Sequence, residues 1–494
     1  MGELTLILSL NLFRRNRLPK FRAALFKGQW GLGQRPIERI VIMITDFATN
    51  KYIVCGMARS GIAAAELLAS KGADVTLQDM KPLSVLEQAH DLDGFRNDGI
   101  KIFAGANPDD IITDFDCVVL SPGVPFDLPF IVKAQENNIP VISEVELAYA
   151  ITPCPVCAIT GTNGKTTTTT LTGLFLAEKY NTAVVGNIGT AYTGEVTKLD
   201  KNSYVCAEIS SFQLEGTISF KPHISAVLNI TPDHLNRHKT MENYVAMKEK
   251  IFANQTADDY TILNYNDDYC RKMSNKTKAK TFFFSSSDKL DEGIFLDGEY
   301  IHIKWNGIDE NLVNVNDLKI LGVHNYENVM AATACAICAD VDLNTIRRVL
   351  SAFKGVEHRI EYCGTYNGVD CYNDSKGTNP DAAIRAVLAM KKPIVLIGGG
   401  YDKNSEYDEW VKLFEGRVKD LVLIGVTAPK IAECCDKYGF KNYEFADTFE
   451  ECIDKCKKAA KDGDCILLSP ACASWGMFED YEQRGRIFKE LVAK

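Results

Sequence analysis

The segment Ala158–Thr167, AITGTNGKTT, lies where a short apolar run ends in a turn with two glycines and a helical pattern begins. A glycine turn lets successive backbone N–H groups converge on an anion, and the following helix directs its free N–H groups and positive dipole end at the same point. Lys165 adds a positive charge, and Thr166 offers a hydroxyl to a magnesium ion. We therefore predict a nucleotide phosphate site here.

This segment departs from the strict phosphate-loop pattern, because Ile159 stands where that pattern has its first glycine. The alternative is an ordinary β-to-α turn rich in Thr and Gly. The register of strand, loop, Lys-Thr pair and helix favours the phosphate site. The residues predicted to hold phosphate are Gly161, Thr162, Asn163, Gly164, Lys165, Thr166 and Thr167.

Length and composition restrict the class of protein. The 494 residues are enough for about three domains, and the formal net charge is -10. Because nucleic acids are bound by basic faces, an acidic balance argues against a nucleic-acid partner. No apolar run reaches the ~18 residues needed to cross a bilayer. Two pairs among the 16 cysteines have C-x-x-C spacing, without the His/Cys cluster of a zinc finger, so we expect free thiols in a reducing cytoplasm.

Residues 1–42 differ from the rest of the chain, because they hold eight Lys or Arg and two Glu. Their apolar run, Leu4 to Phe13, precedes the charges, which is the reverse of a signal peptide. A membrane-surface or partner-binding arm is one interpretation. We prefer a poorly ordered basic extension, with the folded protein starting near residue 43.

The next segment, from Lys51 to Asp79, has the strand, turn, helix, strand pattern of a Rossmann-like half. Ala58 occupies the position of the middle glycine of dinucleotide-binding turns, so this pattern alone is weak evidence for a cofactor. Asp79 ends the second strand, where an acid can meet a ribose or base, and a purely structural Asp is the alternative. Another strand ends at Ser121, at the edge where such sheets bind ligands.

Downstream of the phosphate loop, three polar residues follow apolar runs: Asn187, Glu208 and His234. Glu208 precedes Ser210 and Gln213, whose S-x-x-Q spacing predicts a capping box. A carboxylate at this strand end can hold magnesium. By residue type alone, Asn187 is an ordinary turn residue, and a lone His is more often structural than a ligand.

Lys248 lies on a helix that we expect to begin at Thr240 as N-cap, on a face shared with Tyr244, Ile251 and Phe252. A lysine among apolar neighbours is costly unless it is functional or paired. The alternative, a stem that carries the ammonium out to water, is favoured on the residues alone. From about Gly355 onward, alternating strand and helix patterns predict another parallel α/β layer.

Several unrelated motifs occur here in one order, and together they resemble those of the Mur ligases. The closing stretch, LSPACASW with EQRG, resembles that of the members that add D-glutamate. The resemblance covers about residues 45–494. The motifs are GTNGKT at 161–166, EISSFQLE at 208–215, NITPDHL at 229–235, HNYEN at 324–328, HR at 358–359, NDSKGTN at 373–379, LSPACASW at 468–475 and EQRG at 482–485.

The resemblance implies an α/β protein of three domains. Residues 43–148 would form a Rossmann-like domain that binds the UDP substrate, 149–355 a central P-loop ATPase-type domain that binds ATP, and 356–494 a Rossmann-like domain that receives the amino acid. The implied reaction joins D-glutamate to UDP-N-acetylmuramoyl-L-alanine through an acyl phosphate, with ATP and Mg²⁺, in peptidoglycan precursor synthesis. A cytoplasmic monomer and closure of the three domains around the ligands are also implied.

The family's site residues are carried over by position. Thr166 and Glu208 would hold one magnesium ion and His234 a second, and Lys248 matches the lysine that the family carbamylates. Reaction of its neutral amine with CO₂ would turn a cation into an anion that assists a metal. Contacts to ATP are implied for Asn325, Arg359 and Asp374; contacts to D-glutamate for Lys376, Thr378, Ser474 and Tyr481; and contacts to the uridine nucleotide for Ser60, Asp79, Ser121 and Asn187. Gly476 departs from the family pattern, which often has Asp there.

Three alternatives remain on the sequence alone: a sibling Mur ligase, a folylpolyglutamate-type ligase, and an inactive nucleotide-binding regulator. The stretch from Ser469 to Gly485 argues against the first two. Joint retention of four residues argues against the third, because a binding-only protein does not need residues for two metal ions. These residues are Lys165, Glu208, His234 and Lys248.

Overall fold

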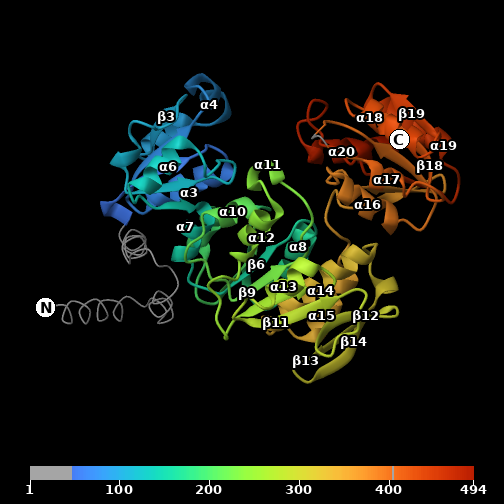
Figure 1. Ribbon diagram of the computed structural model, residues 1–494, viewed down its shortest axis with the longest axis horizontal. Helices are drawn as coiled ribbons and strands as arrows, with labels where there is room; N and C mark the ends of the chain where they lie inside the picture. Colours follow the sequence, from blue (N-terminus) through green and yellow to red (C-terminus); the bar gives the residue numbers. More distant parts are fainter. Residues whose placement is uncertain (1–46, 403–404) are drawn as a thin grey trace.

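The computed structural model describes residues 47–402 and 405–494, which form three α/β domains in chain order (Figure 1). The N-terminal domain is blue in Figure 1, the central domain green to yellow, and the C-terminal domain orange to red. The extension expected at residues 1–42 lies outside the described residues. Within the described ranges, no helix is long and apolar enough to cross a membrane.

The N-terminal domain has a five-stranded parallel sheet of order β3-β2-β1-β4-β5. This order confirms the Rossmann-like prediction, and it places a ligand crevice beyond the carboxyl end of β1, where the strand order reverses. The strands are β1 (Lys51–Cys55), β2 (Asp74–Asp79), β3 (Lys101–Ala104), β4 (Cys117–Leu120) and β5 (Val141–Ser143). The helices are α3 (Arg59–Ser70), α4 (Leu83–Ala89), α5 (Leu92–Asn97), α6 (Pro129–Glu136) and α7 (Glu144–Ile151).

The central domain has a nine-stranded sheet of order β14-β13-β12-β11-β10-β9-β6-β8-β7, in which only β13 runs antiparallel to the other strands. Its strands are β6 (Val156–Thr160), β7 (Asn181–Gly186), β8 (Ser203–Glu208), β9 (Ile224–Val227), β10 (Tyr260–Asn264), β11 (Lys280–Ser285), β12 (Gly293–Asp297), β13 (Tyr300–Trp305) and β14 (Ile308–Asn314). Its helices are α8 (Lys165–Ala177), α9 (Tyr192–Glu195), α10 (Ser211–Glu215), α11 (Leu235–His238), α12 (Met241–Glu249), α13 (Asp268–Met273), α14 (Val323–Cys338) and α15 (Leu343–Ala352).

The C-terminal domain has a six-stranded sheet of order β15-β16-β20-β17-β18-β19, with only β15 antiparallel. If β17 to β20 are numbered 1 to 4, they follow the Rossmann order 3-2-1-4. The strand β16, which comes earlier in the chain, lies beside β20. The strands are β15 (Glu361–Tyr366), β16 (Val369–Asn373), β17 (Ile394–Gly398), β18 (Val418–Ile424), β19 (Tyr443–Ala446) and β20 (Cys465–Leu468). The helices are α16 (Pro380–Ala389), α17 (Asp408–Val411), α18 (Ala428–Lys437), α19 (Phe449–Ala459) and α20 (Tyr481–Val492).

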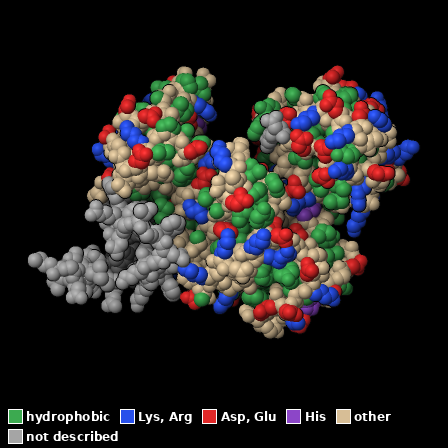
Figure 2. Space-filling model, in the orientation of Figure 1, with side chains coloured by type: hydrophobic (Ala, Val, Ile, Leu, Met, Phe, Trp, Pro, Cys, Tyr) green, Lys and Arg blue, Asp and Glu red, His purple; other side chains and the backbone are tan. Residues whose placement is uncertain are grey.

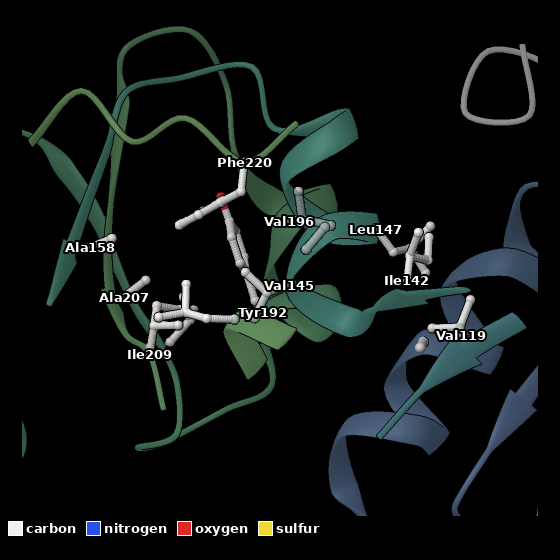
Figure 3. Packing of buried hydrophobic residues seen from close by; sticks show 14 of the residues in the cluster. Val119, Ile142, Val145, Leu147, Ala158, Tyr192, Val196, Ala207, Ile209 and Phe220 are labelled. Atoms are coloured by element: carbon white, nitrogen blue, oxygen red, sulfur yellow. The ribbon is translucent and has the colours of Figure 1, made fainter. Parts of the chain in front are cut away.

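The N-terminal and central domains share one hydrophobic core. Val119 and Ile142 of the first sheet belong to the same buried cluster as Ala158 and Ala207 of the second, with the α9 residue Tyr192 fully buried among them (Figure 3). The C-terminal domain has separate clusters of its own. These two neighbouring domains are therefore joined by apolar packing, whereas the third domain folds around its own core.

The carboxylate of Glu146, in α7, links the two domains by accepting hydrogen bonds from the central domain. The side chain is fully buried and accepts hydrogen bonds from the backbone N–H groups of Ile218, Ser219 and Phe220 at 2.7–3.1 Å. The hydroxyl of Ser219 donates to the same carboxylate. A charged group this deep is tolerated because it satisfies several donors at once.

We predict that Glu146→Ala lowers the free energy of unfolding by about 3 kcal/mol, because three buried N–H groups lose their acceptor. Urea unfolding followed by circular dichroism measures the change. Glu195→Ala is the control, since Glu195 pairs with the exposed Lys198 and its loss should shift stability by less than about 0.5 kcal/mol. Equal effects of the two substitutions would contradict the role given to Glu146.

Candidate functional site

The predicted site residues of the central domain gather at one edge of its sheet. β6 lies between β8 and β9, so the phosphate loop that follows β6 meets Glu208 at the end of β8 and Asn229 just beyond β9. Figure 2 shows the molecule deeply indented between the N-terminal and C-terminal domains, above the central domain. Ligands at this edge can therefore be reached from all three domains.

The phosphate loop has the predicted strand-turn-helix geometry. Gly161 and Gly164 have φ angles of +150° and +86°, in the region that glycine favours. A Cβ atom at Gly164 would lie 2.2 Å from the Asn328 amide oxygen, so no side chain fits there. No side chain caps the first turn of α8, which leaves its N–H groups directed at a ligand position.

Lys165 is folded back over its own loop. Its Nζ donates to the carbonyl oxygens of Gly161 and Thr162, each at 2.9 Å. Burial lowers the pKa of this amine, and the nearby carboxylate of Glu208 partly opposes the shift. The ammonium group is thus held where an incoming phosphate can exchange for the two carbonyls.

Glu208 is 2% exposed and has an open coordination position. Its Oε1 accepts a hydrogen bond of 2.9 Å from the Asn187 side-chain amide, while the buried Oε2 has no hydrogen-bond partner among the described residues. A buried carboxylate oxygen without a partner among the described residues is the kind of hard oxygen ligand that Mg²⁺ prefers, and the Thr166 hydroxyl offers another. The residues present fit the ion.

His234 adopts a left-handed backbone conformation, with φ of 53°, at the start of α11. Its side chain is 50% exposed, and its Nε2 lies 3.4 Å from Asp233 Oδ2. The imidazole packs against the Phe212 ring, with 4.8 Å between ring centroids. The Phe212 ring and Asp233 thus orient a half-exposed imidazole.

Lys248 is buried, which overturns our expectation that its ammonium extends to water. Thr240 does cap α12, as predicted, but the Lys248 side chain is 1% exposed. Its Nζ donates to Gly161 O at 2.9 Å and lies 3.4 Å from Thr160 Oγ1. Burial, and then the positive charge of Lys165, holds the pKa of this amine well below its usual value and so shifts it towards the neutral form.

The C-terminal domain reaches the phosphate loop through polar contacts. Arg359 and Lys376 both donate to the Thr166 hydroxyl, at 3.2 and 3.3 Å, and the Asn163 side chain donates to Asp381. Burial, and then the charge of Arg359, lowers the pKa of Lys376 to about 8. Two basic side chains of the C-terminal domain therefore meet the phosphate loop at Thr166.

Asp374, Asn325 and Lys376 occupy positions consistent with ligand contacts near this junction. The carboxylate of Asp374 accepts from Ser469 Oγ at 2.8 Å, and burial raises its pKa to about 7. Asn325 Nδ2 donates to Leu321 O at 2.7 Å. Lys376 Nζ lies 5.1 Å from the centre of the Tyr481 ring, and the Thr378 N–H bonds to Lys376 O.

Ser474 is buried in the C-terminal domain. It lines a small cavity at the carboxyl ends of the strands, together with Gly400, Met477 and Arg484. Gly476, where the family often has Asp, has φ of +84° and open space around its Cα. The absent carboxylate therefore leaves no packing defect.

The residues expected to bind the uridine nucleotide divide between two places. Ser60, Asp79 and Ser121 lie around the turn at Gly56 in the N-terminal domain: Asp79 Oδ2 accepts from the Met57 N–H at 2.8 Å, and Ser121 Oγ donates to Gly56 O at 2.9 Å. Asp79 thus makes a structural contact with this turn, and its contact with a nucleotide stays a prediction. Asn187, in contrast, lies beside Glu208 in the central domain.

Sequence reasoning missed two arginines that connect loops of the site. Arg237 joins the central domain to the turn after β4, and the buried Arg484 joins the Ser375 loop to the carbonyl of Cys472. Arg237 has no sequence signal that separates it from a surface residue, whereas Arg484 lies in the EQRG motif but received no role from it. Their positions follow from which loops the fold brings together.

Comparison with known proteins covers all three domains. Residues 50–143 match the model of the Mur ligase MurD-like N-terminal domain, 159–336 the Mur ligase middle domain, and 358–472 the Mur ligase glutamate ligase domain. A UDP-N-acetylmuramoylalanine--D-glutamate ligase of Lachnospira eligens is 51% identical over 90% of this chain and 99% of its own. The ligase of the same name from Clostridioides difficile is 43% identical over 90% of this chain and 99% of its own.

Solved structures agree at the level of the fold. The UDP-N-acetylmuramate-alanine ligase of Thermotoga maritima is 20% identical, with a TM-score of 0.55 over 90% of this chain and 99% of its own. A pseudomurein peptide ligase of Methanothermus fervidus is 19% identical, with the same TM-score and coverage. The matching domains, the high identity over nearly the full length of the relatives and the shared fold lead to one conclusion: this chain belongs to the Mur ligase family.

Proposed function

We propose that this chain is the ATP-dependent ligase that adds D-glutamate to UDP-N-acetylmuramoyl-L-alanine in peptidoglycan precursor synthesis. The observation that carries the proposal is the 51% identity to a ligase of that name along almost its whole length. The site supports it, because one sheet edge holds a phosphate loop, an open carboxylate and a buried lysine. We further propose domain boundaries near residues 148 and 355, and a monomer in the cytoplasm.

The first chemical step needs a carboxylate to approach a phosphoryl group of like charge. In it, the L-alanyl carboxylate attacks the γ-phosphorus of ATP, giving an acyl phosphate and ADP. The loop amides, Lys165, Arg359 and Lys376 supply the positive potential around the transferred group. Thr166 and Glu208 would hold one Mg²⁺ and His234 a second. Bound there, the metal ions neutralise charge on the phosphoryl oxygens.

The second step forms the amide. The amine of D-glutamate attacks the acyl carbon, and phosphate leaves. We place the side-chain carboxylate of D-glutamate near Lys376, Thr378, Ser474 and Tyr481, because a cation and hydroxyl groups suit a dicarboxylate. Asn325 and Asp374 are assigned to the adenosine of ATP, and Ser60, Asp79, Ser121 and Asn187 to the uridine nucleotide.

Lys248 has a specific role in this proposal. A buried primary amine with a lowered pKa is a nucleophile for CO₂, and the resulting carbamate carries a negative charge that can pair with Lys165 or a magnesium ion. The N–C bond forms as one proton leaves the nitrogen. This reaction would remove the repulsion between two adjacent lysines.

We predict that phosphate release from ATP in the presence of UDP-N-acetylmuramoyl-L-alanine depends on D-glutamate. The assay compares D-glutamate with L-glutamate, meso-diaminopimelate, L-lysine and L-alanine. Release with another of these amino acids would indicate a sibling ligase. Absence of release with all of them would favour the nucleotide-binding regulator.

We predict that Glu208→Gln lowers kcat by about 100-fold or more, because the amide cannot supply the anionic oxygen that the metal requires. Steady-state phosphate release measures the loss. Glu178→Gln, at an exposed carboxylate paired with Arg348, serves as a matched control and should keep wild-type turnover. A Glu208→Gln enzyme with normal kcat would remove Glu208 from the mechanism.

We predict a carbamate on Lys248. Protein equilibrated with ¹³C-labelled bicarbonate should show a protein-bound carbamate carbon by ¹³C NMR, and the signal should be absent in Lys248→Arg, whose guanidinium does not add CO₂. Lys272→Arg, at an exposed lysine of α13, controls for reaction at surface amines. A signal that persists in Lys248→Arg would assign the carbamate elsewhere.

A further inference from the structure

Arg237 lies at a junction between the two domains that share a core. Its guanidinium donates to the carbonyl oxygens of Pro122 and Val124, at 2.9 and 3.1 Å, in the N-terminal turn that follows β4. The same group pairs with both carboxylate oxygens of Glu215, at the end of α10 in the central domain. Four hydrogen bonds thus tie one turn to one helix end.

The guanidinium of Arg237 also contacts the candidate catalytic histidine indirectly, through the Phe212 ring. Arg237 lies 4.2 Å from the centre of the Phe212 ring, and that ring packs against His234 at 4.8 Å. Arg237 and His234 are also three residues apart around α11, where the Arg237 N–H bonds to His234 O. A shift of Arg237 would therefore move the His234 imidazole through two routes.

The N-terminal turn that Arg237 holds belongs to the substrate-binding region. Ser121, at its start, donates to Gly56 O, and a Cβ at Gly56 would lie 3.2 Å from a Val124 methyl. This packing leaves the turn little freedom relative to the first β-to-α connection of the domain. Its position relative to the central domain is set in part by the two carbonyl bonds to Arg237.

The groups around Arg237 favour a single, persistent arrangement. The side chains of Arg237 and Glu215 are 14% and 12% exposed, so their ion pair is partly shielded from water. His238 packs beside them, and burial lowers its pKa to about 4, so it adds no competing positive charge near neutral pH. Lys250 Nζ donates to the backbone carbonyl of Glu215, whereas Arg237 donates to the Glu215 carboxylate.

We propose that Arg237 is a positioning residue that sets the substrate-binding turn Ser121–Val124 and the His234 imidazole at a fixed separation. The inference rests on the proposed function, in which the uridine nucleotide is held by the N-terminal domain while its carboxylate reacts beside His234. A misplacement of about 1 Å between bound group and catalytic group can cost about 100-fold in rate. A guanidinium suits the task because its planar donors reach two carbonyls and a carboxylate together.

The central test is Arg237→Lys, which keeps the charge but cannot make the four hydrogen bonds. The expected result is a decrease in kcat of about 10- to 100-fold and a raised KM for UDP-N-acetylmuramoyl-L-alanine, with the KM for ATP within twofold of wild type. Arg271→Lys is the matched control, because Arg271 also contacts a carbonyl, a carboxylate and an aromatic ring, on α13 away from the site. The control should keep all three parameters.

Hydrogen exchange in the ligand-free protein gives a readout independent of turnover. The Val124 amide, bonded to Ser121 O, should exchange at least 10-fold faster in Arg237→Lys, whereas amides of β10 should not change. Phe212→Leu removes the ring between Arg237 and His234, and it should lower kcat without changing exchange at Val124. Wild-type kcat in Arg237→Lys, or a loss that follows only the fraction of unfolded protein, would overturn the proposal. Failure of D-glutamate-dependent release in the wild type would instead overturn the proposed function.

Discussion

The carbonyl oxygen of Gly161 accepts hydrogen bonds from two lysines, Lys165 and Lys248, each at 2.9 Å. Placing two amines on one buried carbonyl is unfavourable when both are charged, since like charges repel and burial removes their hydration. The cost is tolerable when one amine is neutral or when anions arrive. Phosphate bound at the loop, or a carbamate on Lys248, would each reduce this repulsion by adding negative charge.

The charged side chains around the loop also favour the binding of anions. Glu208 offers a buried oxygen that no described residue bonds, while Arg359 and Lys376 approach Thr166 from the C-terminal domain. The loop thus lies in a field with an excess of positive charge. ATP and metal-bound oxygens would balance that field, so ligand binding and closure of the C-terminal domain are expected to be coupled.

The three domains are joined in physically different ways. The N-terminal and central domains share a continuous apolar core around Tyr192, with the buried Glu146 and Arg237 as polar ties. The C-terminal domain contributes side chains to the phosphate loop through a few hydrogen bonds and keeps separate cores. Apolar interfaces resist sliding because separation exposes large areas to water, whereas polar contacts exchange readily with ligands and solvent.

The sequence by itself determined the three α/β layers, the phosphate loop and the capping of α10 and α12, because these depend on local patterns of glycine, apolar residues and caps. Only the tertiary structure decided that Lys248 is buried, that Asn187 meets Glu208, and that Arg237 bridges two domains. Each of these depends on residues far apart in the chain. A side chain's burial and partners are set by which strand ends and loops the fold brings together, and no local pattern encodes that neighbourhood.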